Sequence, residues 1–248
     1  FGVGLCQTLQ YAISLKETGR ISRITAGPNV LNFPFEQDNL IESDDIELYM
    51  MPSEWFRQMF ALMSPKAESK LRIWAAGVDD ALLEIKTRKT RKAILYKKGD
   101  QTEEFYSDMC KTMNDRGFEV VVFEYGKYGF DDYISELKGA SFVAAVSDTE
   151  SQGLYLAEAW AMDVPTLCFE PGCYTWKKEQ WGIDISWPLT STCPYLSEYT
   201  GVRFHSLEDF QKIIRHIDVI LDMTSPREWV ANNMTDSICS KGFLEILR

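Results

Sequence analysis

The sequence lacks the residue patterns of a metal-binding or disulfide-stabilised protein. It contains only two histidines, His205 and His216, and none of its six cysteines forms a Cys-x-x-Cys pair. No zinc-ligand spacing can therefore be read from it. A chain of 248 residues is also long enough to fold without disulfide bonds. We interpret most of the cysteines as small core residues in a reducing compartment, and we expect no metal site.

An excess of positive charge and a long apolar run are also missing. The 26 Lys and Arg residues stand against 37 Asp and Glu residues, so the net charge is −11. This balance argues against a protein that binds nucleic acid and against a polybasic membrane-surface protein. No apolar run approaches the ~20 residues of a bilayer span, and no signal peptide is visible. We expect a cytoplasmic protein, and its 45% hydrophobic residues are ample for a buried core.

The first 85 residues alternate between helix and strand patterns. The patterns predict helices over 4–18 and 54–63, and strands over 21–26, 47–51 and 71–75. Because three short strands do not make a complete sheet domain, we interpret 1–85 as a partial lobe. The basic run 86–92 (Lys-Thr-Arg-Lys-Thr-Arg-Lys) is typical of a solvated linker, and docking to anionic lipid head groups is the alternative interpretation.

Residues 93–225 contain a second and longer alternation. Continuous apolar runs such as Glu-Val-Val-Val-Phe are typical of strands that are covered on both faces. They predict strands over 93–96, 118–123, 141–147 and 166–169, with helices over 103–116, 131–138 and 154–162. Such alternation indicates a mostly parallel, doubly wound sheet. We expect an irregular aromatic loop over 170–200 and two final helices, at about 206–222 and 227–247.

Three strand ends of this second part carry side chains suited to ligand binding. In open parallel sheets, ligands bind beyond the carboxyl ends of the strands. Lys97 and Lys98 follow the first strand, Tyr125 and Lys127 follow the second, and the run 147–153 follows the third. We expect these loops to share one edge of the sheet. For both lysine-bearing loops, an ordinary solvated loop is the alternative interpretation.

The run from Glu150 to Glu158 indicates the most specific chemistry. Gly153 allows a tight turn into a helix, whose first-turn N–H groups and dipole form a site for a diphosphate. Glu150 lies before the helix and Glu158 within it, so the two carboxylates face different parts of one ligand. Carboxylates accept hydrogen bonds from sugar hydroxyls, while Lys97 or Lys98 would supply positive charge for the phosphates. The pattern suits a nucleotide sugar.

The run 150–165 resembles the signature of retaining GT-B glycosyltransferases, above all glycosyltransferase family 4. Members carry two glutamates with seven residues between them, then a helix of small residues and a Val-Pro strand start. Further stretches in the order of the family extend the resemblance over roughly 45–248: Pro-Ser-Glu-Trp at 52–55, Ala-Gly-Val-Asp at 76–79, Leu-Tyr-Lys-Lys-Gly at 95–99, and Pro-Arg-Glu at 226–228.

The resemblance implies an α/β fold of the GT-B type, with two Rossmann-like doubly wound lobes of which the N-terminal one is truncated. These would be a partial acceptor-side lobe at 1–85, a linker at 86–92 and a nucleotide-sugar donor lobe at 93–225, with a helix at 226–248 that crosses back to the first lobe. The implied activity is transfer of a hexosyl group from a nucleoside-diphosphate sugar to a glycan, lipid or protein acceptor. Configuration would be retained, and neither a metal nor a cofactor would be needed.

The resemblance also implies roles for single residues. Glu158 would hold the ribose hydroxyls, and Glu150 the hydroxyls of the transferred sugar. The backbone of Ser151, Gln152, Gly153 and Leu154 would meet the sugar or the diphosphate. Lys97 and Lys98 would stabilise charge on the leaving diphosphate, although Lys97 stands where the family usually carries an arginine. Apart from the resemblance, we expect Tyr125 and Lys127 to lie beside the base.

The sequence departs from the family in its first lobe, which lacks the N-terminal Gly-rich loop and the acceptor-binding surface. A missing N-terminal segment or a partner subunit would complete it, and peripheral contact with a membrane is compatible with the basic linker. Two other functions stay open. One is a non-catalytic subunit that binds a nucleotide sugar, and the other is a GT-B-type sugar-nucleotide epimerase or phosphorylase. The aromatic residues Tyr174, Trp176, Trp181 and Trp187 either pack against the core or stack on sugar rings.

Overall fold

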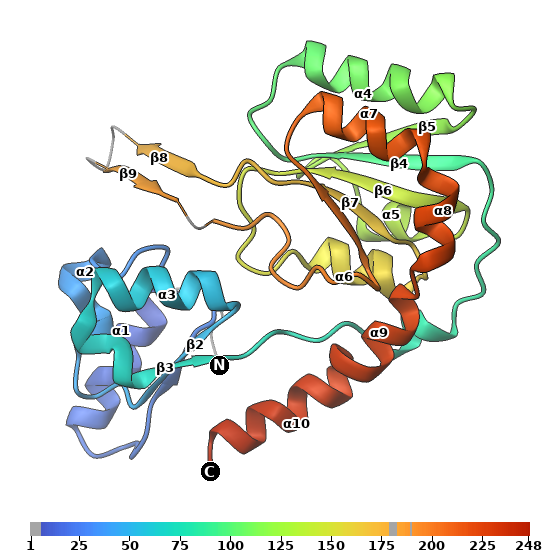
Figure 1. Cartoon of the computed structure of the whole chain (residues 1–248). Helices are drawn as coiled ribbons and strands as arrows, with labels where there is room; N and C mark the ends of the chain where they lie inside the picture. The colour runs from blue at the N-terminus through green and yellow to red at the C-terminus, as the bar shows by residue number, and fades with distance from the viewer. Residues whose placement is uncertain (1–5, 179–182, 189) are drawn as a thin grey trace. The chain divides into compact units, whose positions relative to one another are not determined.

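The computed structural model describes residues 6–178, 183–188 and 190–248, which form two compact units (Figure 1). The first unit comprises Phe1–Ala76 and Lys241–Arg248, and the second comprises Gly77–Ser240. The first unit therefore ends at Ala76, whereas the sequence places the end of the first lobe at residue 85. The last residues of the chain are grouped with the first unit.

The first unit is built on a three-stranded parallel sheet with the strand order β1-β2-β3. In the sheet, Tyr49 of β2 is the partner of Ala26 on one side and of Leu71 on the other. The elements are α1 (Cys6–Glu17), β1 (Thr25–Ala26), α2 (Glu36–Asn39), β2 (Leu48–Met51), α3 (Glu54–Met63) and β3 (Leu71–Ile73), with 3-10 turns at Leu40–Glu42 and Pro65–Lys70. The strand predicted over 21–26 is thus shortened to two residues.

Aromatic side chains from β2 and α3 pack in the core of the first unit. Phe56 and Phe60 of α3 are in contact, with ring centroids 5.0 Å apart, and Phe60 stacks on Tyr49 at 6.2 Å. The Tyr49 hydroxyl accepts a hydrogen bond from the Leu31 N–H at 2.9 Å. The polar atom of this buried ring is therefore paired, as burial requires.

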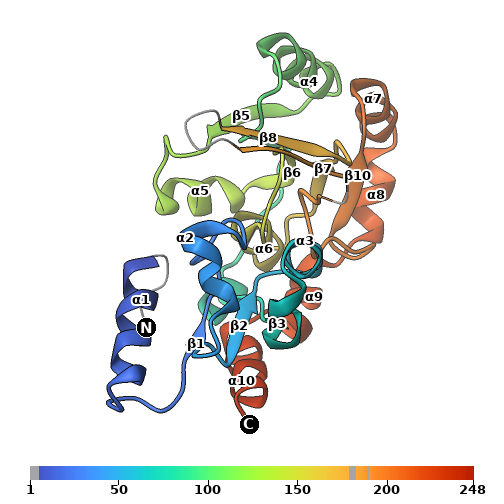
Figure 2. The same ribbon diagram turned by 90° about the vertical axis from the view of Figure 1, so that its left-hand side faces the viewer.

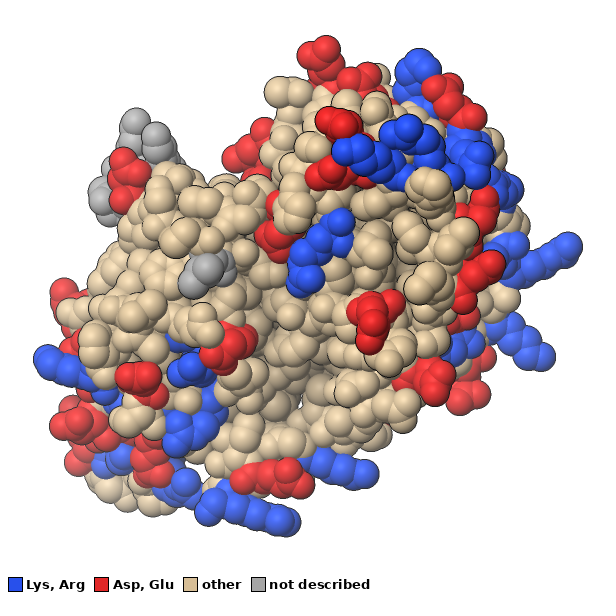
Figure 3. Space-filling view, in the orientation of Figure 1, with Lys and Arg blue, Asp and Glu red and all other residues tan. Residues whose placement is uncertain are grey.

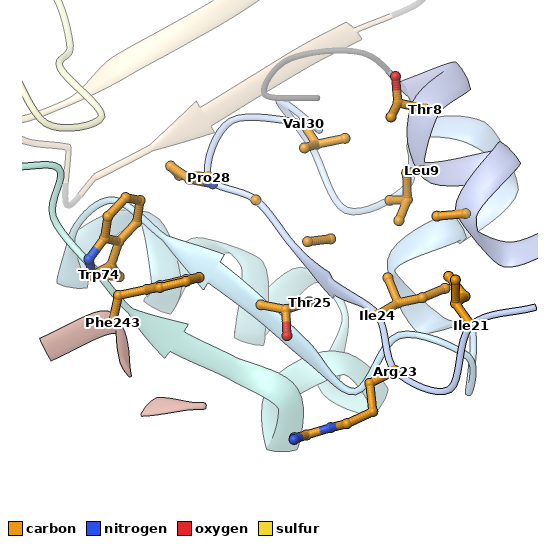
Figure 4. A pocket seen from close by; sticks show the side chains of 13 residues that line it. Thr8, Leu9, Ile21, Arg23, Ile24, Thr25, Pro28, Val30, Trp74 and Phe243 are labelled. Carbon is orange, nitrogen blue, oxygen red and sulfur yellow. The ribbon is translucent and has the colours of Figure 1, made fainter. Parts of the chain in front are cut away.

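The first unit also contains an apolar cavity of about 230 Å³ between α1, β1 and the chain near Trp74. Figure 4 shows Trp74 and Phe243 at one end of it, and Leu9 and Ile21 at the other. Arg23 is the only titratable side chain among the described residues that line it. Because such a lining offers no acid–base pair, we assign no reaction to this cavity.

The second unit contains a five-stranded parallel sheet with the strand order β10-β7-β6-β4-β5. Its elements are a 3-10 turn at Asp80–Glu84, then β4 (Lys92–Lys97), α4 (Glu103–Asp115), β5 (Glu119–Glu124), α5 (Phe130–Leu137), β6 (Ala140–Val146), α6 (Leu154–Ala161), β7 (Thr166–Phe169), β8 (Tyr174–Lys178), β9 (Ile183–Trp187), β10 (Gly201–Phe204), α7 (Leu207–Arg215), α8 (Ile217–Met223), α9 (Pro226–Asn233) and α10 (Asp236–Ile246). The prediction of a parallel, doubly wound sheet is confirmed.

Helices cover both faces of this sheet, which explains its continuous apolar strands. Figures 1 and 2 show α4 and α7 on one face, and α5 and α6 on the other. Under α4 and α7, side chains of both helices and of the sheet form one core, which includes Leu95, Met109, Met113, Phe142, Phe210 and Ile214. On the outer surface of α4 and α7, acidic and basic side chains are interspersed (Figure 3).

Residues 170–200, which we predict as an irregular loop, instead contain two strands, and a third, β10, follows them directly. β8 and β9 form an antiparallel hairpin that is a sheet of its own, and β10 pairs with β7 at the edge of the large sheet. The hairpin strands alternate between large apolar and polar residues, a period-two pattern that the aromatic richness of the segment concealed. β10 has no apolar run and depends on pairing with β7. Trp181 lies outside the described residues.

Each of the two predicted C-terminal helices is divided in the structure. α7 and α8 meet at His216, whose backbone angles (φ −112°, ψ 17°) are not helical. Between α9 and α10, the Met234 carbonyl accepts a hydrogen bond from the Val78 N–H (3.0 Å), and the Asp236 N–H donates to the Val78 carbonyl (2.9 Å). Pairing with a segment far away in the sequence thus interrupts the helix, and local periodicity does not reveal it.

We expect Gly201→Ala to destabilise the second unit strongly. Gly201 begins β10 with a φ of +152°, and a Cβ there would lie 1.9 Å from the carbonyl oxygen of Thr166 in β7. The two strands would have to separate, at a cost on the order of 3 kcal/mol or more in the free energy of unfolding. Urea denaturation monitored by circular dichroism measures this cost.

Gly117→Ala is the matched control for this prediction. Gly117 also has a positive φ, +84°, but a Cβ there would meet no atom within 4 Å. Only backbone strain remains, at about 1 kcal/mol. Equal losses of stability in the two variants would contradict the assigned role of the close approach between β10 and β7.

Candidate functional site

The carboxyl ends of β4, β5 and β6 bring the three predicted loops to one edge of the sheet. The Lys98 N–H donates a hydrogen bond to the Val146 carbonyl of β6 at 2.8 Å. On the other side, the Tyr125 N–H donates to the Lys97 carbonyl at 2.9 Å. The lysine pair therefore lies between the two neighbouring strand ends, because β4 is the strand between β6 and β5.

The turn after β4 also packs closely against the loop after β6. The Asp100 N–H donates a hydrogen bond to Asp148 Oδ2 at 3.0 Å. A Cβ on Gly99 would lie only 2.8 Å from Asp148 Oδ1, so a larger residue would require the Asp148 carboxylate to shift. The loops that carry Lys98 and Glu150 are therefore adjacent.

Helix α6 begins at the point where the sequence predicts a diphosphate site. Gly153 is its N-cap residue with a φ of +79°, a conformation that glycine adopts without strain. No side chain forms a cap hydrogen bond to this helix. In the part of the chain that the structure describes, the N–H groups of Leu154 and Tyr155 have no hydrogen-bond partner. The first turn is therefore able to bind an anion.

Glu150 is buried, with 5% of its surface exposed, and two side chains hold its carboxylate. Lys98 Nζ lies 2.8 Å from Oε2, and Ser147 Oγ donates a hydrogen bond to Oε1 at 3.0 Å. Burial raises the pKa of Glu150, although Lys98 and Ser147 act in the opposite direction. The backbone is fixed as well, because the Glu150 N–H donates to the Ser191 carbonyl at 2.8 Å.

Glu158 lies within α6 and has a different environment. It is half-buried, and within the described residues its carboxylate has neither a cation nor a hydrogen-bond donor. Burial alone raises the pKa of Glu158 to about 7. A carboxylate that is partly desolvated without a partner is costly for the fold, and this combination is typical of a functional site.

An aromatic cluster of four tyrosines, Tyr96, Tyr128, Tyr133 and Tyr155, lies close to both glutamates. Tyr96 stacks on Tyr155 with ring centroids 3.9 Å apart, and the Tyr128 hydroxyl donates to the Tyr96 hydroxyl at 2.8 Å. Burial raises the pKa of Tyr128, its hydrogen bond with Tyr96 acts in the opposite direction, and the charges of Glu158 and Glu150 raise the pKa further. Sequence reasoning missed this cluster because its members come from a strand, a loop and two helices.

Each lysine assigned to the site from the sequence is bound to a glutamate in the structure. The three N–O distances are 2.8 Å for Lys97–Glu103, 2.8 Å for Lys98–Glu150 and 2.5 Å for Lys127–Glu124. The lysines supply positive charge at the sheet edge, but adjacent carboxylates balance it. A phosphate group must therefore compete with a glutamate for each ammonium group.

A cavity of about 220 Å³ lies beside the lysine pair. Its lining consists of Lys97, Lys98, Gly99, Gln101, Glu103, Tyr106, Glu124 and Tyr125. The Lys98 ammonium lies 4.6 Å from the centroid of the Tyr125 ring, which is 60% exposed. Tyr125 thus forms part of the cavity wall, whereas Lys127 is not among the lining residues and is bound to Glu124.

The other assigned residues connect Glu150 to α6. Ser151 is half-buried and Gln152 is buried, while the Leu154 side chain is 44% exposed at the first turn of the helix. Gly153 is buried, and a Cβ there would lie 2.9 Å from Leu156 Cδ1. The segment is therefore compact, and at Leu154 the backbone N–H rather than the side chain is suited to an anionic ligand.

Sequence reasoning missed a second buried carboxylate at this edge. Glu170 follows β7 with 7% of its surface exposed, and its Oε2 accepts hydrogen bonds from Ser191 Oγ (3.2 Å) and the Thr192 N–H (3.3 Å). Its Oε1 has no hydrogen-bond partner among the described residues. Because the Ser191 carbonyl binds the Glu150 N–H, Glu170 fixes the segment behind Glu150. No local sequence signal joins residues 170 and 191.

Neither a protein-family model nor a curated protein matches the sequence. Solved structures do match its fold. A glycosyltransferase from Rickettsia africae aligns with 97% of this chain and 79% of its own, with a TM-score of 0.61 and 11% identity. HepE from Anabaena, in complex with UDP and glucose, covers 97% of this chain and 75% of its own, with a TM-score of 0.64 and 10% identity.

A third match is the lipopolysaccharide outer core galactosyltransferase WaaB, with a TM-score of 0.58 and 11% identity over 97% of this chain and 72% of its own. The chain has the GT-B glycosyltransferase fold. In this GT-B fold, the second unit carries the site described above, at the carboxyl ends of its parallel strands.

On this GT-B fold, the groups of the candidate site are suited to binding a ligand. Among the described residues, no group of three or more His, Cys, Asp or Glu side chains could hold a metal ion. No described helix is long and apolar enough to cross a membrane.

The site combines an open helix N-terminus, two lysines and two carboxylates that differ in burial and pairing. Such a set of groups can bind a ligand that carries both phosphates and hydroxyls.

Proposed function

We propose that this protein is a glycosyltransferase that moves a hexosyl group from a nucleoside-diphosphate sugar to a glycan, lipid or protein acceptor. The observation that carries the proposal is the open first turn of α6, which follows Glu150 in the chain and precedes Glu158 within the same helix. The GT-B fold supports it, and the matching HepE structure is a complex with UDP and glucose. Retention of configuration is part of the proposal because the run 150–165 resembles retaining enzymes.

In the proposed complex, each group has one task. The Glu158 carboxylate accepts hydrogen bonds from the ribose hydroxyls, and Glu150 binds the hydroxyls of the hexose. The N–H groups of Leu154 and Tyr155 bind the diphosphate, and Lys98 stabilises the charge that develops on it as the sugar departs. Tyr125 packs beside the base.

The ion pair between Lys98 and Glu150 links these tasks. Both side chains are at least partly buried, and their N–O distance is 2.8 Å. When a diphosphate attracts Lys98, Glu150 loses its cation and its carboxylate is released to accept hydrogen bonds from the hexose. Phosphate binding and sugar binding are therefore coupled through one contact.

Calorimetric titration of the whole chain with UDP, GDP and their hexose derivatives tests the proposal. We expect one nucleotide to bind, and Lys98→Gln to weaken that binding about 10-fold or more because a charge-assisted hydrogen bond is lost. Lys111→Gln is the control, since Lys111 is an exposed lysine of α4 in an ion pair with Asp115. The proposal is wrong if no nucleotide binds, or if both variants bind it as the wild type does.

A non-catalytic subunit that binds a nucleotide sugar is the second candidate function. The balanced charge of the site favours it, because none of the three lysines is free of a carboxylate partner. Release of UDP from UDP-hexose, measured over hours with the purified chain, separates the two. Slow hydrolysis of the donor supports the transferase, whereas tight binding with no release of UDP supports the binding subunit.

A further inference from the structure

The β8–β9 hairpin has one aromatic face and one polar face. In its antiparallel register, Tyr174 is the partner of Trp187, and Trp176 is the partner of Ile185. Because side chains alternate along a strand, these four residues lie on the same face. Thr175 and Ser186 are partners on the opposite face, where their hydroxyls are 2.6 Å apart. Figure 1 shows the hairpin extending away from the five-stranded sheet of the second unit.

Both ends of this hairpin are attached to the candidate site. Before it, Glu170 lies at the carboxyl end of β7, and after it come Ser191 and Thr192, which donate hydrogen bonds to Glu170 Oε2. The Ser191 carbonyl then accepts the Glu150 N–H at 2.8 Å. The buried Glu170 carboxylate therefore joins the segments before and after the hairpin. The second of these segments is hydrogen-bonded to Glu150, the residue assigned to the transferred sugar.

The first aromatic residue of the hairpin lies close to the loops of the site. Burial raises the pKa of Tyr174, and the charges of Asp148 and Asp100 raise it further. These two aspartates belong to the adjacent loops that carry Glu150 and Lys98, and they are joined by the hydrogen bond from the Asp100 N–H to Asp148. The aromatic face thus begins beside the acidic side of the candidate site.

We propose that the aromatic face of the β8–β9 hairpin, formed by Tyr174, Trp176, Ile185 and Trp187, binds the sugar rings of a neutral carbohydrate acceptor. This inference rests on the proposed transferase function and names its acceptor class. Flat aromatic rings pack on the apolar faces of sugars, and a phenol group can add a hydrogen bond to a hydroxyl. The indole nitrogen of Trp187 is buried, so this ring offers only its apolar surface. The neighbouring carboxylates disfavour an anionic acceptor or an anionic lipid surface. An acceptor held here lies next to the hexose on Glu150.

Titration with maltohexaose, cellohexaose and chitohexaose in the presence of saturating UDP tests this inference. We expect at least one of them to bind to the whole chain. Tyr174→Leu and Trp187→Leu should each weaken that binding at least 10-fold, because leucine keeps apolar volume but removes the flat ring. Ser186→Ala is the matched control: it removes the polar-face contact of the same hairpin and should leave oligosaccharide binding within about twofold.

The outcomes separate this inference from the proposed function. If UDP binds but no hexasaccharide does, the acceptor assignment is wrong and the donor site stands. The same conclusion follows if the leucine variants bind the hexasaccharide as tightly as the wild type does. Binding of vesicles with phosphatidylglycerol that is lost in the leucine variants would overturn it in favour of a lipid surface. If Ser186→Ala weakened oligosaccharide binding as much as the leucine variants do, the loss would reflect hairpin stability and would overturn the inference. Failure of UDP itself to bind rejects the proposed function.

Discussion

Replacing Glu158 by alanine is expected to abolish measurable binding of the nucleotide. In the proposed complex this carboxylate accepts hydrogen bonds from both ribose hydroxyls, and it has no other partner among the described residues. Loss of two charge-assisted hydrogen bonds weakens affinity by at least about 100-fold. Isothermal titration with UDP measures the effect. Glu136→Ala is the control. Glu136 is a glutamate of α5, and its ion pair with Lys92 lies at the start of β4, the end of that strand opposite the candidate site.

The same residue predicts how nucleotide affinity depends on pH. The pKa of Glu158 is about 7, so the carboxylate is mostly protonated at pH 6 and mostly ionised at pH 8. The ionised form accepts hydrogen bonds from both hydroxyls, and UDP affinity should therefore rise over this range. Glu158→Gln should bind UDP weakly at both pH values. A wild-type affinity that falls between pH 6 and pH 8 would contradict this assignment.

Stability should respond to pH in the opposite direction. Because the pKa of Glu158 is raised from about 4.5 to about 7 on folding, the folded chain binds more protons than the unfolded chain between these values. The protonated carboxyl stabilises the fold at low pH, and that contribution is lost as pH rises through 7. At pH 8, Glu158→Gln should be more stable than the wild type by up to about 3 kcal/mol, and at pH 5 the gain should fall to about 1 kcal/mol or less. Denaturation at both pH values measures the difference.

The second large effect is expected at Glu150, where the variant Glu150→Gln should separate nucleotide binding from sugar transfer. Removal of the charge releases Lys98 from its 2.8 Å ion pair and makes the ammonium available to a phosphate. UDP affinity should stay the same or increase up to about 10-fold. Transfer or hydrolysis of the hexose should fall by at least about 100-fold, because the sugar hydroxyls lose a charged acceptor. Titration with UDP and a UDP-release assay measure the two effects.

Glu103→Gln is the matched control for this variant. It releases Lys97 in the same way, but Glu103 is 87% exposed and lies at the first turn of α4 instead of beside the sugar. UDP affinity should not fall in this control, and the rate of hexose release should remain within a few-fold of the wild type. If Glu150→Gln weakened UDP binding as much as it weakened sugar transfer, Glu150 would only maintain the loop.

The parallel sheet of the second unit could be predicted because its strands are continuous apolar runs. The sequence places strands at 93–96, 118–123 and 166–169, and the structure has them at Lys92–Lys97, Glu119–Glu124 and Thr166–Phe169. Burial on both faces requires apolar residues throughout such a strand, so the pattern is local. The hairpin and β10 were not predicted in this way, because the aromatic richness of the hairpin concealed its alternation and β10 has no continuous apolar run.

The proximity of two residues of the candidate site, Lys98 and Glu150, could also be predicted from the sequence. Parallel strands place their carboxyl ends at one edge, and the sequence therefore predicts that Lys98 and Glu150 lie near each other, as their 2.8 Å contact confirms. Their mutual pairing was not predicted, because the sequence gives the charges but not which of them are in contact. The pairing changes the chemistry, since it converts an available cation into one that a ligand must compete for.

The order of residues along this chain by itself determined the alternation of strands and helices, the parallel sheet and the loops at its edge, because each depends on the hydrophobic pattern of a few neighbouring residues. Only the tertiary structure decided the environment of each charge: Glu150 buried against Lys98, Glu158 desolvated without a partner among the residues that the structure describes, and Glu170 joined to Ser191 across a hairpin. Burial and ion pairing arise between segments that are distant in sequence, and they set the pKa and the availability of a side chain. For this reason the sequence shows which residue types form the site, but not their pKa values or their ion-pair partners.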